Sequence, residues 1–191
     1  MEKKMTNKLG IIHGRFQILH NGHLEYLLEG LNRCEYLLIG ISSPDSSYTK
    51  FTAANPHRSL DSANPMTYYE RFQMIRAALL EQSVPRERFD IVPFPINVPE
   101  KLFNYVPKDG TYLMTLYDEW SHEKYATLSA LGCEIEVMWE RTNEQKITSG
   151  TEVRSKIILG EPWENLVPDS VSRFIKKNEI DQRIIRMSKE G

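Results

Sequence analysis

Residues 11–23 read Ile11-Ile12-His13-Gly14-Arg15-Phe16-Gln17-Ile18-Leu19-His20-Asn21-Gly22-His23, and this stretch decides the fold. Its apolar start has the length and composition of a buried strand, and from Leu24 onward apolar residues recur at the spacing of a helix. Gly14 allows the backbone to turn sharply between the two. The stretch therefore predicts a strand, a loop and a helix in immediate succession.

Two histidines flank the point where this helix should begin. His20 and His23 would lie near the positive end of the helix dipole, beside unpaired backbone N–H groups, which is where anions bind. Gly22 lets a bulky phosphate approach the backbone, and His13 and Arg15 add donors from the end of the strand. The composition of this loop favours a polyphosphate ligand.

The overall composition limits the choice of function. A chain of 191 residues with 40% hydrophobic residues suits one globular domain, and a formal net charge of −2 gives no basic field for nucleic acid. Cys34 and Cys133 are too few and too far apart for a disulfide framework or a metal site. Without an apolar run long enough to span a membrane, the expected location is the cytoplasm, as a monomer or a homo-oligomer.

Strand and helix signals alternate along the chain. Apolar runs of strand length stand at 36–41, 89–94 and 112–116, and helical patterns at 68–80, 100–105 and 121–131. Residues 134–139 alternate polar and apolar, which indicates a strand near the edge of the sheet. This alternation predicts a doubly wound parallel α/β sheet, Rossmann-like, with its site at the carboxyl ends of the first and of the fourth-to-fifth strands. We expect one domain over residues 1–191, with a loop insertion near 46–65 and a helical extension from about 169.

A second motif occurs far downstream, Ser149-Gly150-Thr151-Glu152-Val153-Arg154. Ser149 or Thr151 can cap the helix that follows, and Gly150 exposes its N–H groups. Arg154 would then lie one turn into that helix. The motif thus predicts a second helix start that presents donors to an anion.

The two motifs together resemble those of a known family. His20-Asn21-Gly22-His23 after a strand resembles the His-x-Gly-His motif of the nucleotidylyltransferase superfamily. Gly14-Arg15-Phe16-Gln17 and Ser149–Arg154 are similar, more narrowly, to the archaeal-type nicotinamide mononucleotide adenylyltransferases. Asn64-Pro65-Met66-Thr67 before Glu70-Arg71 resembles a segment that this family has between its motifs. The resemblance covers residues 9–175.

The resemblance implies a reaction and a set of site residues. Members of the superfamily transfer a nucleoside monophosphate to an acceptor and release pyrophosphate, with Mg²⁺ arriving on the nucleotide, here ATP, and with no protein metal site needed. The implied catalytic residues are His20, His23 and Arg154. The implied nucleotide-binding residues are His13, Gly14, Arg15, Phe16, Gln17, Gly22, Arg71, Ser149, Gly150 and Thr151.

The acceptor side departs from the family pattern. The family recognises nicotinamide with an Asp-Ile-Asn segment and a nearby tryptophan, whereas this chain has Pro95-Ile96-Asn97. The candidate acceptor-binding residues are therefore Asn97 and the aromatic residues Phe103, Tyr105 and Trp120.

Three functional interpretations follow from this departure. The first is an adenylyltransferase that forms NAD from ATP and nicotinamide mononucleotide. The second is an adenylyl- or cytidylyltransferase of the same fold that acts on a different phosphate or phosphonate acceptor. The third is a non-catalytic nucleotide-binding module, which the presence of both histidines and Arg154 disfavours. The loop near 46–65, with Lys50, His57 and Arg58, is either a lid over the nucleotide or a surface excursion.

Overall fold

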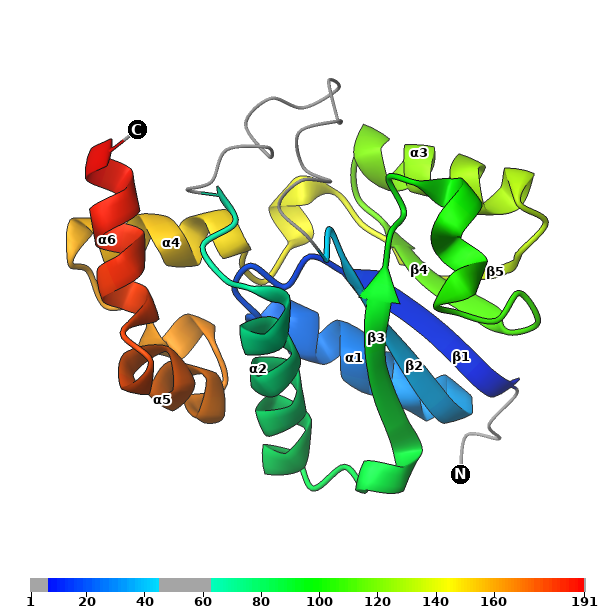
Figure 1. Ribbon diagram of the computed structural model, residues 1–191, viewed down its shortest axis with the longest axis horizontal. Coiled ribbons are helices and arrows are strands. Elements are labelled where there is room, and N and C mark those ends of the chain that lie inside the picture. Colours follow the sequence, from blue (N-terminus) through cyan, green and yellow to red (C-terminus); the bar gives the residue numbers. More distant parts are fainter. Residues whose placement is uncertain (1–6, 45–62, 191) are drawn as a thin grey trace.

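The computed structural model describes residues 7–44 and 63–190, which contain a parallel five-stranded sheet (Figure 1). Its strands, in the spatial order β3-β2-β1-β4-β5, are β1 (Asn7–Gly14), β2 (Cys34–Ser42), β3 (Phe89–Phe94), β4 (Thr111–Leu116) and β5 (Glu134–Glu140). The chain moves outward from β1 to β3 and then returns to add β4 on the other side of β1. Such a reversal leaves a crevice at the carboxyl ends of the central strands, where ligands bind in sheets of this kind.

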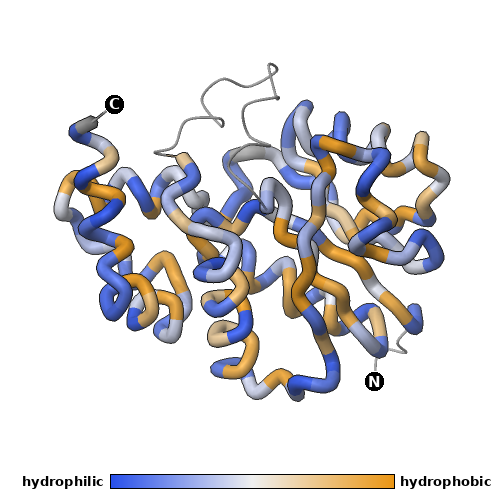
Figure 2. The backbone as a smooth tube through the Cα atoms, viewed as in Figure 1, coloured by the Kyte–Doolittle hydropathy of each residue, from blue (hydrophilic) through white to orange (hydrophobic). Residues whose placement is uncertain are grey.

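Helices cover both faces of the sheet. The helices concerned are α1 (Asn21–Arg33) and α2 (Tyr68–Glu81) on one face, and η5 (Pro99–Asn104) and α3 (Glu119–Ala130) on the other. Ile11 and Ile12 are both fully buried and belong to the cores on opposite faces, because side chains alternate along a strand. Hydrophobic residues accordingly run along the strands (Figure 2). The predicted doubly wound α/β fold is confirmed.

The C-terminal helices form a cluster (Figure 1). They are α4 (Gly150–Leu159), α5 (Asp169–Lys177) and α6 (Ile180–Glu190), and short turns of 3₁₀ helix occur at η4 (Arg86–Arg88), η6 (Asn143–Gln145) and η7 (Glu164–Leu166). In this cluster α5 packs against α2, and α6 packs against α4 and α5. Arg183 donates to both carboxylate oxygens of Glu70 at 2.8 Å and to the carbonyl of Pro65 at 2.9 Å. The extension therefore holds the start of α2 in place.

One expectation about the chain changes here, and another falls mostly outside the described residues. The sequence predicted a single terminal helix, but the structure has two, because Glu179 between them has a φ of +51°, outside the right-handed helical region. The predicted insertion near 46–65, including the lid with Lys50, His57 and Arg58, lies outside the described residues except for 63–65.

None of the helices in the described ranges combines the length and hydropathy that crossing a membrane requires.

Candidate active site

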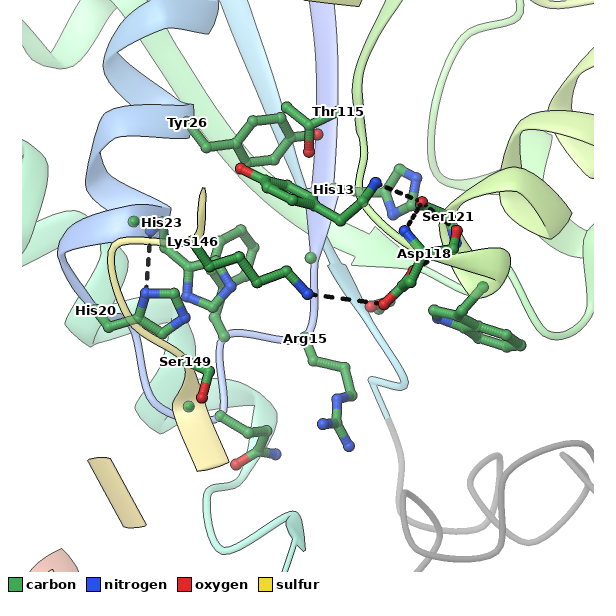
Figure 3. A pocket seen from close by; sticks show the side chains of 18 of the residues that line it. His13, Arg15, His20, His23, Tyr26, Thr115, Asp118, Ser121, Lys146 and Ser149 are labelled. Carbon is green, nitrogen blue, oxygen red and sulfur yellow. Dashed lines mark hydrogen bonds and ion pairs between the residues drawn. The ribbon is translucent and has the colours of Figure 1, made fainter. Parts of the chain in front are cut away.

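A pocket opens at the carboxyl ends of the strands, where the topology leaves its crevice (Figure 3). Its walls come from the β1–α1 loop, the residues after β2, β3 and β4, the N-terminus of α3 and the segment that leads into α4. The two motifs, far apart in the sequence, meet across this pocket. All three predicted catalytic residues and most of the predicted nucleotide-binding residues line it, namely His13, Gly14, Arg15, Phe16, Gln17, His20, Gly22, His23, Ser149, Gly150, Thr151 and Arg154.

The two histidines of the first motif form a stacked pair at the start of α1. The Nδ1 atom of His20 accepts a hydrogen bond from the backbone N–H of His23 at 3.3 Å, which makes His20 the N-cap of the helix. The ring centroids lie 3.8 Å apart, and Phe16 packs edge-on against His23. Nδ1 of His23 is buried and has no hydrogen-bond partner in the described part of the chain. The loop thus holds two stacked imidazoles at a helix N-terminus, in the wall of the pocket.

The sharp turn in this loop occurs at Phe16 and not at Gly14. Phe16 has a φ of +52°, whereas Gly14 has no positive φ. A Cβ atom at Gly14 would lie 2.9 Å from the Phe16 ring, closer than real contacts allow. Gly14 therefore serves to admit the ring that supports His23.

Both imidazoles are neutral at pH 7 in the protein alone. Burial, followed by the charges of Lys146 and Arg154, lowers the pKa of His20 from 6.5 to about 4. Burial and then the neighbouring His20 lower the pKa of His23 well below its usual value. A neutral ring offers one N–H donor, and a bound polyphosphate would favour protonation because nearby negative charge raises the pKa of an imidazole.

The second motif supplies a helix start and a buried cation. Ser149 caps α4 by accepting the N–H of Glu152 at 3.1 Å, so Ser149 is the cap of the two candidates. Arg154 is only 7% exposed, and its guanidinium donates to the carbonyl of Gln17 and, at 3.2 Å, to the hydroxyl of Thr151. No carboxylate within the described ranges forms a salt bridge with it. Arg154 therefore joins the two motifs and places a positive charge in the pocket wall.

Comparison with known proteins identifies the family. The family model described as cytidylyltransferase-like matches residues 11–156. The chain belongs to this family. It is also 50% identical over 175 residues, 92% of this chain and 94% of the relative, to the phosphonoformate cytidylyltransferase of Streptomyces viridochromogenes. The nicotinamide-nucleotide adenylyltransferase of Thermococcus kodakarensis is 32% identical over 184 residues, which cover 93% of this chain and 87% of that protein.

A solved structure supports the same fold. A bifunctional NMN adenylyltransferase/ADP ribose pyrophosphatase from Francisella tularensis superposes with a TM-score of 0.66 at 17% identity. The match covers 95% of this chain but 53% of that one, so this chain spans about half of the larger protein. The resemblance to nucleotidylyltransferases is confirmed, and the cytidylyltransferase-like chain is a nucleotidyltransferase.

Arg71 does not lie where the resemblance placed it. It is 2% exposed and does not line the pocket. Its terminal nitrogens donate, at 2.9 to 3.0 Å, to three carbonyls in the loops after β1 and β2, those of Arg15, Ser42 and Ser43, and its Nε donates to Thr67. In this cytidylyltransferase-like chain Arg71 thus connects two loops under the pocket instead of facing the nucleotide phosphates.

Gln17 lines the pocket, but its amide is engaged elsewhere. The side chain donates to the carbonyl of Met66 at 2.8 Å and accepts from its N–H at 2.9 Å. Gln17 therefore fixes the chain just before α2 against the loop between β1 and α1.

The acceptor candidates separate into two groups. Asn97 and Trp120 line the pocket, whereas Phe103 and Tyr105 do not. Phe103 and Tyr105 are 38% and 45% exposed, at the end of η5. Of the three aromatic candidates for acceptor binding, only Trp120 therefore lines the pocket, and Phe103 and Tyr105 lie outside it at partly exposed positions.

Asp118 and Lys146 are among the pocket residues of this cytidylyltransferase-like chain that the sequence alone did not predict. Asp118 caps α3 by accepting the N–H of Ser121 at 3.0 Å, and its Oδ2 lies 3.7 Å from Nζ of Lys146, which crosses the pocket in Figure 3. Asp118 stands two residues after the end of β4 and directly before α3, and Lys146 stands three residues before Ser149. These positions could have been flagged as strand-end and helix-start residues, but neither belongs to a recognised motif.

The capping role of His20 can be separated from its imidazole chemistry. Because its pKa is about 4 in the folded protein and about 6.5 when unfolded, only the unfolded state takes up this proton as the pH falls. His20 therefore lowers the free energy of unfolding by up to about 3 kcal/mol between pH 6.5 and 4. His20→Asn keeps the cap, so at pH 7 we expect the free energy of unfolding to change by less than ~1 kcal/mol. Because the variant lacks the imidazole, its free energy of unfolding should fall less than that of wild type as the pH decreases.

Chemical denaturation of both proteins from pH 7 to pH 4 measures this difference. His20→Ala is the matched variant, since it also removes the imidazole but should lose ~1 kcal/mol more at pH 7 through the missing cap. Parallel pH curves for wild type and His20→Asn would contradict the assigned pKa.

Proposed function

We propose that this chain is a cytidylyltransferase that transfers CMP from CTP to a small phosphonate and releases pyrophosphate, with an acceptor of the phosphonoformate type. The observation that carries the proposal is the 50% identity, over nearly the full length of both proteins, to a phosphonoformate cytidylyltransferase. The nicotinamide-nucleotide adenylyltransferase relative is only 32% identical in sequence. The segment Pro95-Ile96-Asn97 also lacks the aspartate that the nicotinamide pattern requires.

The pocket supports direct transfer without a covalent enzyme intermediate. An oxygen of the acceptor phosphonate forms a bond to the α-phosphorus of CTP, and the bond from that phosphorus to the β-phosphate oxygen breaks. Pyrophosphate leaves with the electron pair, so the step needs no side-chain nucleophile. The protein must align the two reactants and stabilise charge on the five-coordinate phosphorus and the leaving group.

Each group of donors then has a place in this transfer. His20 and His23 donate to the non-bridging oxygens of the α-phosphate. The first N–H groups of α4 and the guanidinium of Arg154 donate hydrogen bonds to oxygens of the β- and γ-phosphates. Lys146, which is near enough to lower the pKa of His20, adds charge between these two regions. All these contacts strengthen as negative charge moves onto the leaving group.

Mg²⁺ fits the pocket as part of the nucleotide complex. The described residues contain no group of three metal-ligating side chains, and the pocket carboxylates Asp118 and Glu25 form ion pairs with Lys146 and Arg141. A metal held by the triphosphate itself needs few protein ligands. Bound there, it would neutralise phosphate charge, and the residues named above would orient the complex.

A substrate matrix tests the proposal. CTP and ATP are each combined with phosphonoformate, phosphonoacetate and nicotinamide mononucleotide, and pyrophosphate release and the mass of the product are measured. We expect the highest kcat/KM with CTP and phosphonoformate. The second candidate function is that of an NMN adenylyltransferase, which the relative of 32% sequence identity supports. Preferred turnover of ATP with nicotinamide mononucleotide would establish this function instead.

A further inference from the structure

His13 lies in the pocket but is not part of the His20–His23 pair. Its ring stacks flat on Phe94, with centroids 4.4 Å apart and ring planes 7° apart. The side chain is 6% exposed, and neither ring nitrogen has a hydrogen-bond partner in the part of the chain that the structure describes. Burying two polar atoms without partners costs free energy, so the ring is placed for a group that the chain itself does not supply.

The fold makes specific room for this ring. Gly40 on β2 pairs with His13 on β1, and β2 separates β1 from β3, where Phe94 ends the strand. A Cβ atom at Gly40 would lie 2.4 Å from the Phe94 ring, which is a severe overlap. Because Gly40 has no side chain, the Phe94 ring can lie over β2 and stack on the His13 ring.

The surroundings of His13 are positive and rich in donors. Lys124 of α3 also lines the pocket, with Nζ 5.5 Å from the centroid of the Trp120 ring, and its charge adds to burial in lowering the pKa of His13. Both carboxylates that line the pocket are engaged by cations: Asp118 caps α3 and pairs with Lys146, and Glu25 pairs with Arg141. The net field at His13 thus favours an anion.

His13 lies apart from the His20–His23 pair in the view of Figure 3, although the charge of Lys124 lowers the pKa of His23 as well as that of His13. In Figure 3, His20 and His23 gather on one side, and His13 lies with Ser121 and Asp118 on the other. Asn97, after β3, lines the same pocket. An acceptor whose phosphonate reaches the α-phosphate at the histidine pair would therefore direct its far end toward His13.

We propose that His13, Lys124 and Asn97 form an acceptor-recognition corner that binds the second acidic group of the acceptor, the carboxylate of a phosphonocarboxylate. The inference rests on the proposed function and names the specificity residues of the same site. It moves His13 from the nucleotide to the acceptor. The corner selects a compact acceptor with two anionic ends, because a carboxylate gives His13 the hydrogen-bond partner it lacks and pairs with the ammonium of Lys124.

The test compares acceptors with and without the carboxylate. Steady-state kinetics with CTP are measured for phosphonoformate and methylphosphonate, in wild type, Lys124→Met and His13→Leu. We expect each variant to raise the KM for phosphonoformate about 10- to 100-fold, the effect of one charge-assisted hydrogen bond. The values for methylphosphonate and the Kd for CTP, measured by calorimetry, should stay within about threefold of wild type. The wild-type preference for phosphonoformate should therefore disappear.

Lys177→Met on α5 is the matched control, because it removes an equally positive but exposed side chain outside the pocket. Retained affinity for CTP shows that a variant is folded. Suppose that wild type turns over CTP and phosphonoformate, but that the variants raise the KM for both acceptors equally or raise the Kd for CTP. The corner is then wrong and the proposed function stands. If wild type turns over neither phosphonate with CTP, the proposed function fails and the corner fails with it.

Discussion

Replacing His23 by alanine is expected to lower kcat for nucleotidyl transfer by about 10²- to 10³-fold, with a much smaller change in the KM for the nucleoside triphosphate. The reason is that a hydrogen bond to the α-phosphate gains most when charge accumulates there in the transition state. The cap of α1 survives this substitution, because His20 accepts the backbone N–H of residue 23 and not its side chain. The loss should therefore appear in the rate and not in the stability.

Pyrophosphate release under saturating substrates measures this effect, and thermal unfolding verifies the stability. His122→Ala is the matched control, since His122 is an exposed histidine on α3 that does not line the pocket. A His23→Ala rate within about threefold of wild type, a loss below ~1 kcal/mol, would remove His23 from the mechanism.

The sequence was sufficient to predict the fold because its signals are local. Strands β1 to β4 contain apolar runs, β5 alternates polar and apolar residues, and a capping box of Thr67 and Glu70 marks the start of α2. The order of the strands in the sheet depends on contacts between distant segments, and the switch point between β1 and β4 could be inferred only from the general architecture. The break at Glu179 was missed because helical periodicity continues on both sides of it.

The sequence predicted the site residues that belong to the two motifs, but not the other residues of the pocket. His20, His23 and Arg154 meet in one pocket, as the two motifs implied. Sequence cannot tell a buried arginine that binds carbonyls from one that faces a ligand, so Arg71 was misplaced. Lys124 is not part of any motif, and it becomes informative only when α3 brings it to the pocket that His13 also lines.

Replacing Arg154 by methionine is expected to reduce kcat/KM for the nucleoside triphosphate by about 10²- to 10³-fold, a loss of roughly 3–4 kcal/mol of transition-state stabilisation. Two effects combine. The variant removes a buried positive charge from the wall that faces the polyphosphate, and it removes the hydrogen bond that holds the start of α4 against Gln17. Both the affinity for the nucleotide and the rate should therefore fall, in contrast to the His23 variant.

Arg154→Lys separates the two effects. A lysine keeps the charge but cannot reproduce the fork that reaches Gln17 and Thr151 together, so we expect a partial recovery of nucleotide affinity with a rate still well below wild type. Calorimetric Kd values and single-turnover rates measure the two quantities independently. Arg186→Met, at an exposed position of α6, is the control for loss of charge alone. If Arg154→Met bound the triphosphate as tightly as wild type, Arg154 would be a structural link between the motifs, and the phosphates would depend on the α4 N-terminus and Lys146 for their positive field.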